Sequence, residues 1–171
     1  MPAIHRCDLP ADALLSRYQY DGAYTDCYVA TIARRVAHAE YVETFYTTTL
    51  FKTERLLLSW FASKPSTDAE AKQLAAGTRD TFAAWTVEAR SPDQLLLADF
   101  QGRTRSWLMV RSAPDAAPAG TRLYFGSAVV PARGGKANAD APTLGPAFRL
   151  LLGFHKLYSR ALLTAAASRL A

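Results

Sequence analysis

Apolar side chains recur along residues 145–171 at the three- and four-residue steps of a long one-sided helix. Pro146 is well placed for the first turn of this helix. The apolar positions are Phe148, Leu151, Phe154, Tyr158, Ala161, Leu162 and Ala165. Arg149, Lys156 and Arg160 fall on the opposite face. Another part of the protein has to cover such a stripe, so we expect a C-terminal helix that packs on the rest of the chain.

The first half of the chain changes from a strand pattern to helical patterns. Residues 24–36 are rich in Tyr, Thr, Val and Ile and contain no breaker, which is typical of a strand. Residues 38–61 have helical spacing, but β-branched side chains make the run Thr47-Thr48-Thr49 poor helix material. We expect two helices or a kink there. A further helical segment is predicted to begin at the capping box Thr67-Asp68-Ala69-Glu70 and to end at Gly77.

Strand patterns return in the second half of the chain. The four predicted strands are residues 82–90, 94–100, 103–111 and 121–130. Ser91-Pro92-Asp93 and Gln101-Gly102 favour turns between them, so we expect an antiparallel meander. Residues 131–144 are rich in Gly, Pro and Ala, which predicts a flexible loop before the last helix. Residues 1–22 are expected to be a lead-in segment.

This order of elements predicts one α+β domain over residues 1–171. A curved antiparallel sheet of about five strands is expected to wrap the C-terminal helix, with two shorter helices after the first strand. The order, and the segment FRLLLGFHKLYSRALL, resemble the helix-grip fold of the START-related, polyketide-cyclase-like (SRPBCC) superfamily over roughly residues 24–171. The superfamily commonly has more strands. The resemblance implies an apolar pocket between sheet and helix, in which relatives hold lipids, sterols, polyketides or other hydrophobic molecules and occasionally process them.

Charge and composition narrow the possible partners. The net charge is +5, but the basic residues are scattered among acidic ones, and no four of them are consecutive. A nucleic-acid-binding protein usually has a clustered basic stripe, so we expect no nucleic-acid partner. The sequence begins without the apolar region of a signal peptide and has no apolar stretch of about 18 residues, so a cytoplasmic location without stable membrane insertion is predicted. Cys7 and Cys27 are too few for a disulfide framework and are expected to be incidental thiols.

Turn chemistry assigns the two faces of the meander. If Gln101-Gly102 is a two-residue loop, Leu97 lies opposite Ser106. Charged side chains then collect on one face, which we take as the outer one. The predicted inner positions are Val87, Ala89, Leu95, Leu97, Asp99, Thr104, Ser106, Leu108, Val110, Leu123, Phe125, Ser127 and Val129. Glu88 and Arg90 are expected on the outer face.

Polar side chains on the inner face and on the last helix are the candidate chemistry. Asp99, Thr104 and Ser106 either anchor a ligand in an apolar pocket, or Asp99 belongs to the turn and the hydroxyls bond to the backbone. His155 and Tyr158 lie within the apolar arc of the helix. They are either core residues or polar groups in the cavity, where the imidazole could act as an acid or a base.

We favour a protein that binds a hydrophobic or amphipathic small molecule, with no cofactor and no metal. The expected ligand-binding residues are His155, Tyr158, Asp99, Ser106, Phe125, Phe148 and Leu151. The alternative is a cyclase-, dehydratase- or hydrolase-like enzyme that uses His155 with Tyr158 or Asp99. We lean away from catalysis because the sequence has no nucleophile elbow, zinc-binding or dinucleotide-binding motif. A less favoured alternative places the basic side of the last helix on anionic lipid.

Large apolar residues also fall on the predicted outer face, namely Trp107, Met109 and Phe100. Either neighbouring arginine side chains screen them, or they form a contact between two copies of the protein. We favour a homodimer through this face. Glu88 and Arg105 are expected to pair across the strands beside them.

Overall fold

One antiparallel sheet of seven strands forms the centre of the protein, in the order β1-β2-β7-β6-β5-β4-β3. The computed structural model describes residues 2–53, 66–114, 119–130 and 146–171, the last range with side chains from residue 157 onward. The strands are β1 (Ile4–Arg6), β2 (Tyr24–Ile32), β3 (Thr81–Phe82), β4 (Trp85–Ser91), β5 (Gln94–Asp99), β6 (Thr104–Ala113) and β7 (Gly120–Val129). The helices are α1 (Ser16–Tyr20), α2 (His38–Tyr46), α4 (Asp68–Ala75) and α5 (Pro146–Leu170).

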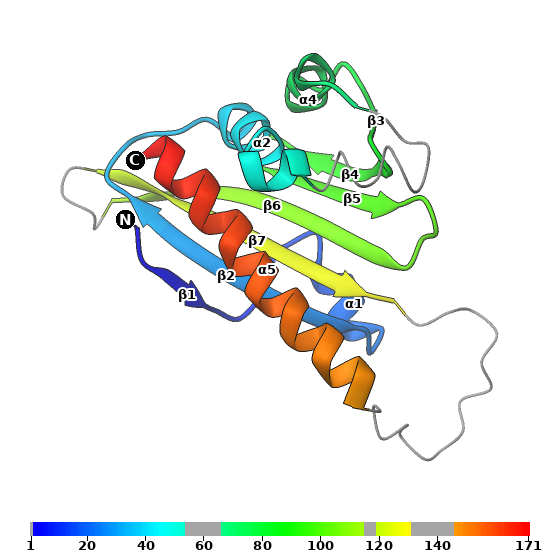
Figure 1. Cartoon of the computed structure of the whole chain (residues 1–171). Helices are drawn as coiled ribbons and strands as arrows, with labels where there is room; N and C mark the ends of the chain where they lie inside the picture. Colours follow the sequence, from blue (N-terminus) through cyan, green and yellow to red (C-terminus); the bar gives the residue numbers. More distant parts are fainter. Residues whose placement is uncertain (1, 54–65, 115–118, 131–145) are drawn as a thin grey trace.

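The long helix α5 runs across one face of the sheet, over β2 and β7, and α2 lies beside its C-terminal end (Figure 1). We call this the inner face. The short helix α1 lies on the opposite, outer face (Figure 1). The predicted α+β fold, with a curved antiparallel sheet and a C-terminal helix, is confirmed, although the sheet has seven strands where about five were expected. The extra strands β1 and β3 have only three and two residues, too short to produce a sequence pattern.

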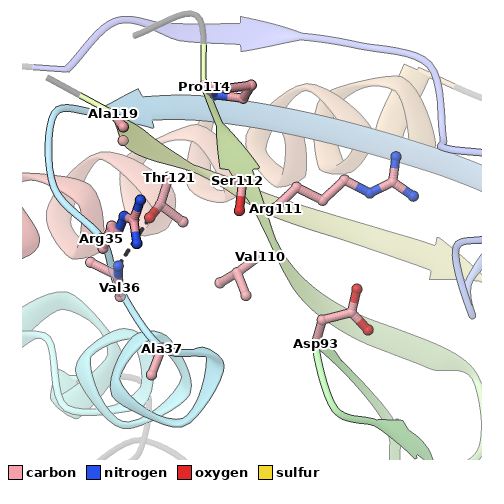
Figure 2. Close-up of a pocket in the computed structure, with 11 residues that line it drawn as sticks. Arg35, Val36, Ala37, Asp93, Val110, Arg111, Ser112, Pro114, Ala119 and Thr121 are labelled. Atoms are coloured by element: carbon pink, nitrogen blue, oxygen red, sulfur yellow. Dashed lines mark hydrogen bonds between the residues drawn. The ribbon is translucent and has the colours of Figure 1, made fainter. Parts of the chain in front are cut away.

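The connection between β2 and α2 is fixed to the neighbouring strand β7. The Thr121 hydroxyl accepts a hydrogen bond from the backbone N–H of Val36 at 3.0 Å, and it donates to the Arg34 carbonyl oxygen at 2.8 Å. The first of these bonds is drawn in Figure 2. One buried side chain thus satisfies two backbone groups of the loop, which holds the start of α2 against the sheet.

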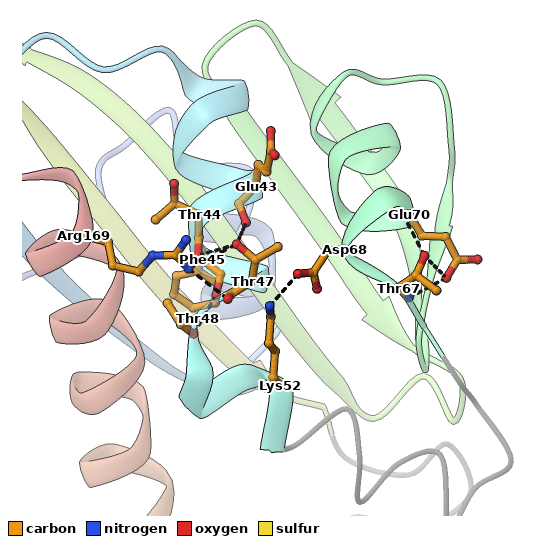
Figure 3. Close-up of polar contacts among 10 residues, drawn as sticks. All are labelled: Glu43, Thr44, Phe45, Thr47, Thr48, Lys52, Thr67, Asp68, Glu70 and Arg169. Atoms are coloured by element: carbon orange, nitrogen blue, oxygen red, sulfur yellow. Dashed lines mark hydrogen bonds and ion pairs between the residues drawn. The ribbon is translucent and has the colours of Figure 1, made fainter.

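The predicted break at the threonine run is confirmed. Helix α2 ends at Tyr46, and residues 49–53 are helical again. The Thr47 hydroxyl donates to the Glu43 carbonyl at 2.8 Å, and this oxygen also accepts from the Thr47 backbone N–H at 3.1 Å (Figure 3). Arg169, near the end of α5, donates to the Thr47 carbonyl at 2.9 Å. The break in α2 is therefore one of the places where the C-terminal helix contacts the rest of the protein.

The capping box predicted before α4 is also confirmed (Figure 3). The Thr67 hydroxyl accepts from the Glu70 N–H at 3.2 Å, and the Glu70 carboxylate accepts from the Thr67 N–H at 2.8 Å. Gly77 follows the helix with a φ of 75°, as a C-terminal glycine should. Lys52 and Asp68 form an ion pair at 2.5 Å that joins the helical residues 49–53 to α4.

The predicted register of the β5–β6 hairpin is confirmed, because Leu97 pairs with Ser106. Gly102 adopts a φ of 69°, and its N–H bonds to the Asp99 carbonyl at 2.8 Å. The apolar inner positions expected from this register are buried under the helices. They are Leu95, Leu97, Leu108, Leu123 and Phe125.

The predicted faces are wrong at Ala89 and Arg90. Ala89 packs in the outer cluster, and Arg90 donates to the Leu74 carbonyl of α4 at 2.9 Å. The β4–β5 loop has two residues rather than the predicted three, because Ser91 pairs with Gln94. A bulge between Val87 and Ala89 then restores the predicted face at Val87.

Residues 7–18 cover the outer face of the sheet. Trp107 and Met109 are fully buried, in a cluster that comprises Ala13, Leu15, Cys27, Leu96, Trp107, Met109 and Ala128. The side-chain amide oxygen of Gln94 (Oε1) accepts from Trp107 Nε1 and from the backbone N–H of Leu14, both at 2.9 Å. Trp107 and Met109 therefore cannot form the predicted contact between two copies. The predicted lead-in segment is a structural layer of the fold.

The predicted pair of Glu88 and Arg105 is confirmed, and Tyr18 of α1 lies over it. The Tyr18 hydroxyl donates to Glu88 at 2.5 Å and accepts from Arg105 Nε at 2.7 Å. The Arg105 guanidinium lies 4.8 Å from the centre of the Tyr18 ring. Phe100, the third apolar residue expected on this face, is 56% exposed.

Removing a buried side chain of the N-terminal segment should weaken the whole fold. Leu15→Ala should lower the free energy of unfolding by about 2–5 kcal/mol, because it leaves a cavity against the sheet. Tyr20→Ala is the matched control, since Tyr20 belongs to the same segment but is 81% exposed; it should change stability by no more than about 0.5 kcal/mol. Urea denaturation measures both. Equal stabilities of the two variants would show that the segment does not seal the outer face.

Candidate functional site

Three buried polar side chains lie next to one another across the inner face, on three neighbouring strands. Asp26 of β2 pairs with Ser127 of β7, and Ser127 pairs with Ser106 of β6. We call these three residues the polar row. Cross-strand neighbours have Cβ atoms about 5 Å apart, so the row brings one carboxylate and two hydroxyls together in space.

The members of the polar row are almost completely shielded from solvent. Asp26 and Ser127 are each 3% exposed, and Ser106 is 7% exposed. The Asp26 Oδ1 atom accepts from the Ser127 hydroxyl at 2.5 Å and from the Ser127 backbone N–H at 3.1 Å. The Ser106 hydroxyl lies 3.1 Å from the hydroxyl of Tyr46, which reaches it from α2. The row is therefore held in place by hydrogen bonds from the sheet and from α2.

On the side away from the β5–β6 turn, the next positions along the same strands are apolar or aromatic. Leu108 and Phe125 form the neighbouring cross-strand pair, and Tyr28 lies opposite Phe125 on β2. Burying a carboxylate is unfavourable unless hydrogen bonds compensate it, and an apolar side chain would pack here without that cost. A polar group in an otherwise apolar, covered face is the arrangement that orients a small ligand.

The carboxylate of Asp26 affects the two tyrosines that flank it on β2. Burial, with a smaller contribution from the negative charge of Asp26, raises the pKa of Tyr24 to about 12. The same two causes, in the same order, raise the pKa of Tyr28. Both phenols therefore stay protonated well above neutral pH and can act as hydrogen-bond donors.

Aromatic rings close the polar row on the side of α2. The Tyr46 ring lies 4.8 Å from Phe51 and 5.4 Å from Phe82, measured between ring centroids. The Phe45 ring lies 4.9 Å from Phe125. These rings pack against one another, so Phe125 contributes to the core on this side as well as to the wall beside the row.

The structure brings together only some of the residues predicted for the site. Ser106 belongs to the polar row, and Tyr158 of α5 lies half-buried against the inner core. Asp99 lies at the turn instead, where its Oδ1 atom accepts from the N–H groups of Arg103 at 2.6 Å and Thr104 at 2.9 Å. The turn interpretation of Asp99 therefore holds. The predicted side chains that lie outside the described residues are those of His155, Phe148 and Leu151.

Asp26 is the member of the site that sequence reasoning missed. Its signal was present: an acidic residue stands in the middle of a strand whose same-face neighbours are Tyr24 and Tyr28. Aspartate is depleted in strands, so its presence there indicates a specific partner. Ser127 was placed on the inner face but was not recognised as that partner.

A hollow opens at the other end of the inner face from the polar row, between the start of α2 and the ends of β6 and β7 (Figure 2). It has a volume of about 690 Å³. Three of its polar side chains already bond to other parts of the protein. Thr121 bonds to the β2–α2 connection, Asp93 accepts from Ser91 at 2.7 Å, and Arg111 forms an ion pair with Asp12. In Figure 2 the Arg111 side chain extends away from Val110 and Thr121. The side chains of the polar row are also hydrogen-bonded, but they are buried and lie side by side, and we therefore take the row as the candidate site.

Two kinds of site are absent from the described part of the chain. No group of three or more His, Cys, Asp or Glu side chains there is arranged to hold a metal ion. None of the helices described is both long enough and apolar enough to span a membrane.

Comparison with known proteins gives a loose structural likeness. No family model matches the chain, and no curated protein matches it. Among solved structures the chain is similar to CalU16 from Micromonospora echinospora, with 13% sequence identity and a TM-score of 0.34. The alignment covers 99% of this chain and 91% of that chain. A likeness at this level carries no argument about function, and membership of the SRPBCC superfamily stays a prediction.

The raised pKa of Tyr24 predicts a late step in an alkaline titration. The titration is followed by the absorbance of the phenolate. The Tyr24→Phe variant should lack a step at about pH 12 and should not lose one near pH 10. Asp26→Asn should move that step to lower pH, because it removes a negative charge that opposes ionisation. Loss of a step near pH 10 in Tyr24→Phe would contradict the half-buried position of Tyr24 beside Asp26.

The same shift predicts how stability depends on pH. The pKa of Tyr24 is higher in the folded state than the ordinary value of 10.0 expected after unfolding. Its contribution to stability is therefore complete below about pH 10 and is lost as pH rises toward 12. In urea denaturation across this range, Tyr24→Phe should lose less stability with rising pH than the wild type.

Proposed function

We propose that the protein binds a neutral amphipathic small molecule between the inner face and α5, with the polar end of the ligand at the polar row. The observation that carries this proposal is the burial of Asp26, Ser127 and Ser106 side by side, next to the apolar and aromatic residues Leu108, Phe125 and Tyr28. A fold that needed only a core would be served by apolar residues at these positions.

Ser106 is the group best suited to contact the ligand. A serine hydroxyl donates one hydrogen bond and accepts two. Its bond with Tyr46 uses one of these, and Tyr46 also fixes its orientation. A ligand hydroxyl or carbonyl at this position would exchange a hydrogen bond with Ser106 and lie against the Tyr46 ring.

The charge of Asp26 restricts the class of ligand. Two strand spacings of about 4.8 Å separate its position from that of Ser106. Charges in a buried site are poorly screened by salt, so a carboxylate on the ligand would be repelled at this distance. We therefore expect the polar end to be a neutral hydroxyl or carbonyl, and the rest of the ligand to be apolar.

The apolar part of the ligand would contact the residues beside the row. Phe125, Leu108 and Tyr28 supply this surface on the sheet. Tyr158, together with the predicted His155, Phe148 and Leu151, would contribute from α5. Binding is preferred to catalysis because Asp99, a member of the acid–base set predicted from the sequence, is committed to its turn.

Two serines on the same strand provide a matched test. Ser106→Ala should weaken the binding of a long-chain alcohol about tenfold, the equivalent of one hydrogen bond to a buried group. Ser112→Ala is the control, because Ser112 lies on β6 as well but is exposed and lines the hollow of Figure 2. Titration calorimetry with dodecanol and with dodecanoate measures both the affinity and the preference for a neutral end.

Three outcomes would count against the proposal. They are absence of binding by either compound, tighter binding of dodecanoate than of dodecanol, and a loss of affinity in Ser112→Ala but not in Ser106→Ala. The last result would move the ligand to the hollow beside α2. Tyr46→Phe is a second variant that retains Ser106 but removes its fixed partner, and it should weaken binding less than Ser106→Ala does.

A further inference from the structure

The two cysteines of the chain face each other on the outer side of the sheet. Cys7 follows β1 directly, and its backbone N–H donates to the Cys27 carbonyl of β2 at 3.0 Å. The two Sγ atoms lie 3.1 Å apart, and both thiols are free. This juxtaposition was not expected from the sequence, where the cysteines are 20 residues apart.

The backbone at this pair already has the spacing that a disulfide requires. The β1–β2 ladder pairs Arg6 with Tyr28, and its next step pairs Cys7 with Cys27. Cα atoms of a hydrogen-bonded antiparallel pair lie about 5.5 Å apart, and disulfides bridge Cα separations of about 4.4–6.8 Å. The sulfurs need only approach by about 1 Å, which a small side-chain rotation provides without movement of the strands.

The two thiols differ in solvent exposure and in pKa, as a reactive pair requires. Cys27 is buried, whereas Cys7 is half-exposed, and both residues border a hollow of about 390 Å³ that Arg6, Asp8 and Gln19 also line. The hydrogen bond between the thiols lowers the pKa of Cys7, and the same bond, together with burial, raises the pKa of Cys27. Cys7 is thus the thiol that an oxidant can reach and that ionises first.

We propose that Cys7 and Cys27 are a redox-active dithiol, in which Cys7 reacts with a hydroperoxide and Cys27 resolves the product as an intramolecular disulfide. The Cys7 thiolate attacks the terminal oxygen of hydrogen peroxide, the O–O bond breaks, and hydroxide leaves. The resulting Cys7 sulfenic acid condenses with the Cys27 thiol, which forms the S–S bond and releases water. Two thiols are oxidised and one peroxide is reduced to two molecules of water.

The disulfide would fix the layer that covers the outer face. Cys27 lies in the same buried cluster as Leu15 and Trp107, and Cys7 packs against that cluster. The Cys7–Cys27 disulfide would attach the first residue of the segment 7–18 covalently to the sheet. Closing a loop of about 20 residues should raise the unfolding temperature by roughly 5–10 °C.

Peptide mapping of the oxidised full-length protein tests the proposal directly. Cleavage after arginine separates the thiols, because Cys7 lies in peptide 7–17 and Cys27 in peptide 18–34. After treatment with a few equivalents of hydrogen peroxide, a digest without reductant should contain these two peptides linked, with two hydrogen atoms fewer than their sum. The linked peptide should disappear on reduction, and the unfolding temperature should return to that of the untreated protein.

Single variants separate the two roles. In Cys27→Ser the reaction with peroxide should stop at a Cys7 sulfenic acid, which a dimedone probe captures. Cys7→Ser should react with peroxide about tenfold more slowly than the wild type, because Cys27 is buried and holds its proton. The proposal is overturned if the wild type yields only over-oxidised Cys7 at the rate seen in Cys27→Ser. It is overturned equally if the linked peptides come from a dimer on a non-reducing gel, or if neither thiol reacts with a peroxide dose that oxidises free cysteine. None of these results bears on ligand binding at the inner face.

Discussion

The pairing of β2 with β7 is the interaction on which the rest of the structure depends. It joins nine residue pairs from Tyr24–Val129 to Ile32–Thr121, and it brings the first long strand of the chain beside the last. Without it the β4–β7 meander would end in an open edge, and the β1–β2 pair would be separated from the rest of the sheet. α5 packs mainly on β2, with further contacts to α2 and β7, so the C-terminal helix also depends on this pairing.

Successive residues of β2 serve opposite sides of the sheet because side chains alternate along a strand. Asp26 points to the inner face and enters the polar row, whereas Cys27 points to the outer face and meets Cys7. Gly126 lies opposite Cys27, and a Cβ atom there would come within 2.9 Å of the Asp26 carbonyl, Leu15 and Trp107. The absence of a side chain at this position lets the N-terminal layer pack closely on the sheet.

The parts of the fold that the sequence predicted correctly are those set by neighbours along the chain. The capping box at Thr67, the helix break at Thr47 and the register of Leu97 with Ser106 each follow from a few adjacent residues. The errors at Ala89 and Arg90 came from one turn that is a residue shorter than expected, compensated by a bulge. A register prediction fails in this way because each slip exchanges the faces.

The parts that could not be predicted depend on contacts between distant segments. Ser127 and Asp26 are 101 residues apart, and nothing local to either one indicates the other. The cover over Trp107 comes from residues 7–18, which carry too few periodic apolar positions to identify a packed layer. The sequence pattern indicated an apolar outer face. It could not show whether a second copy of the protein or a segment of the same chain covers that face.

The two chemical features of β2 are close in sequence yet mechanically separate. Asp26 and Cys27 are neighbours on β2 but point to opposite faces, and this strand is hydrogen-bonded to β1 on one edge and β7 on the other. A strand held on both edges cannot rotate one side chain toward the other face without breaking its ladder. Oxidation of the thiols would therefore act on the attachment of residues 7–18 and leave the polar row in place, so that stability and ligand binding respond to different signals.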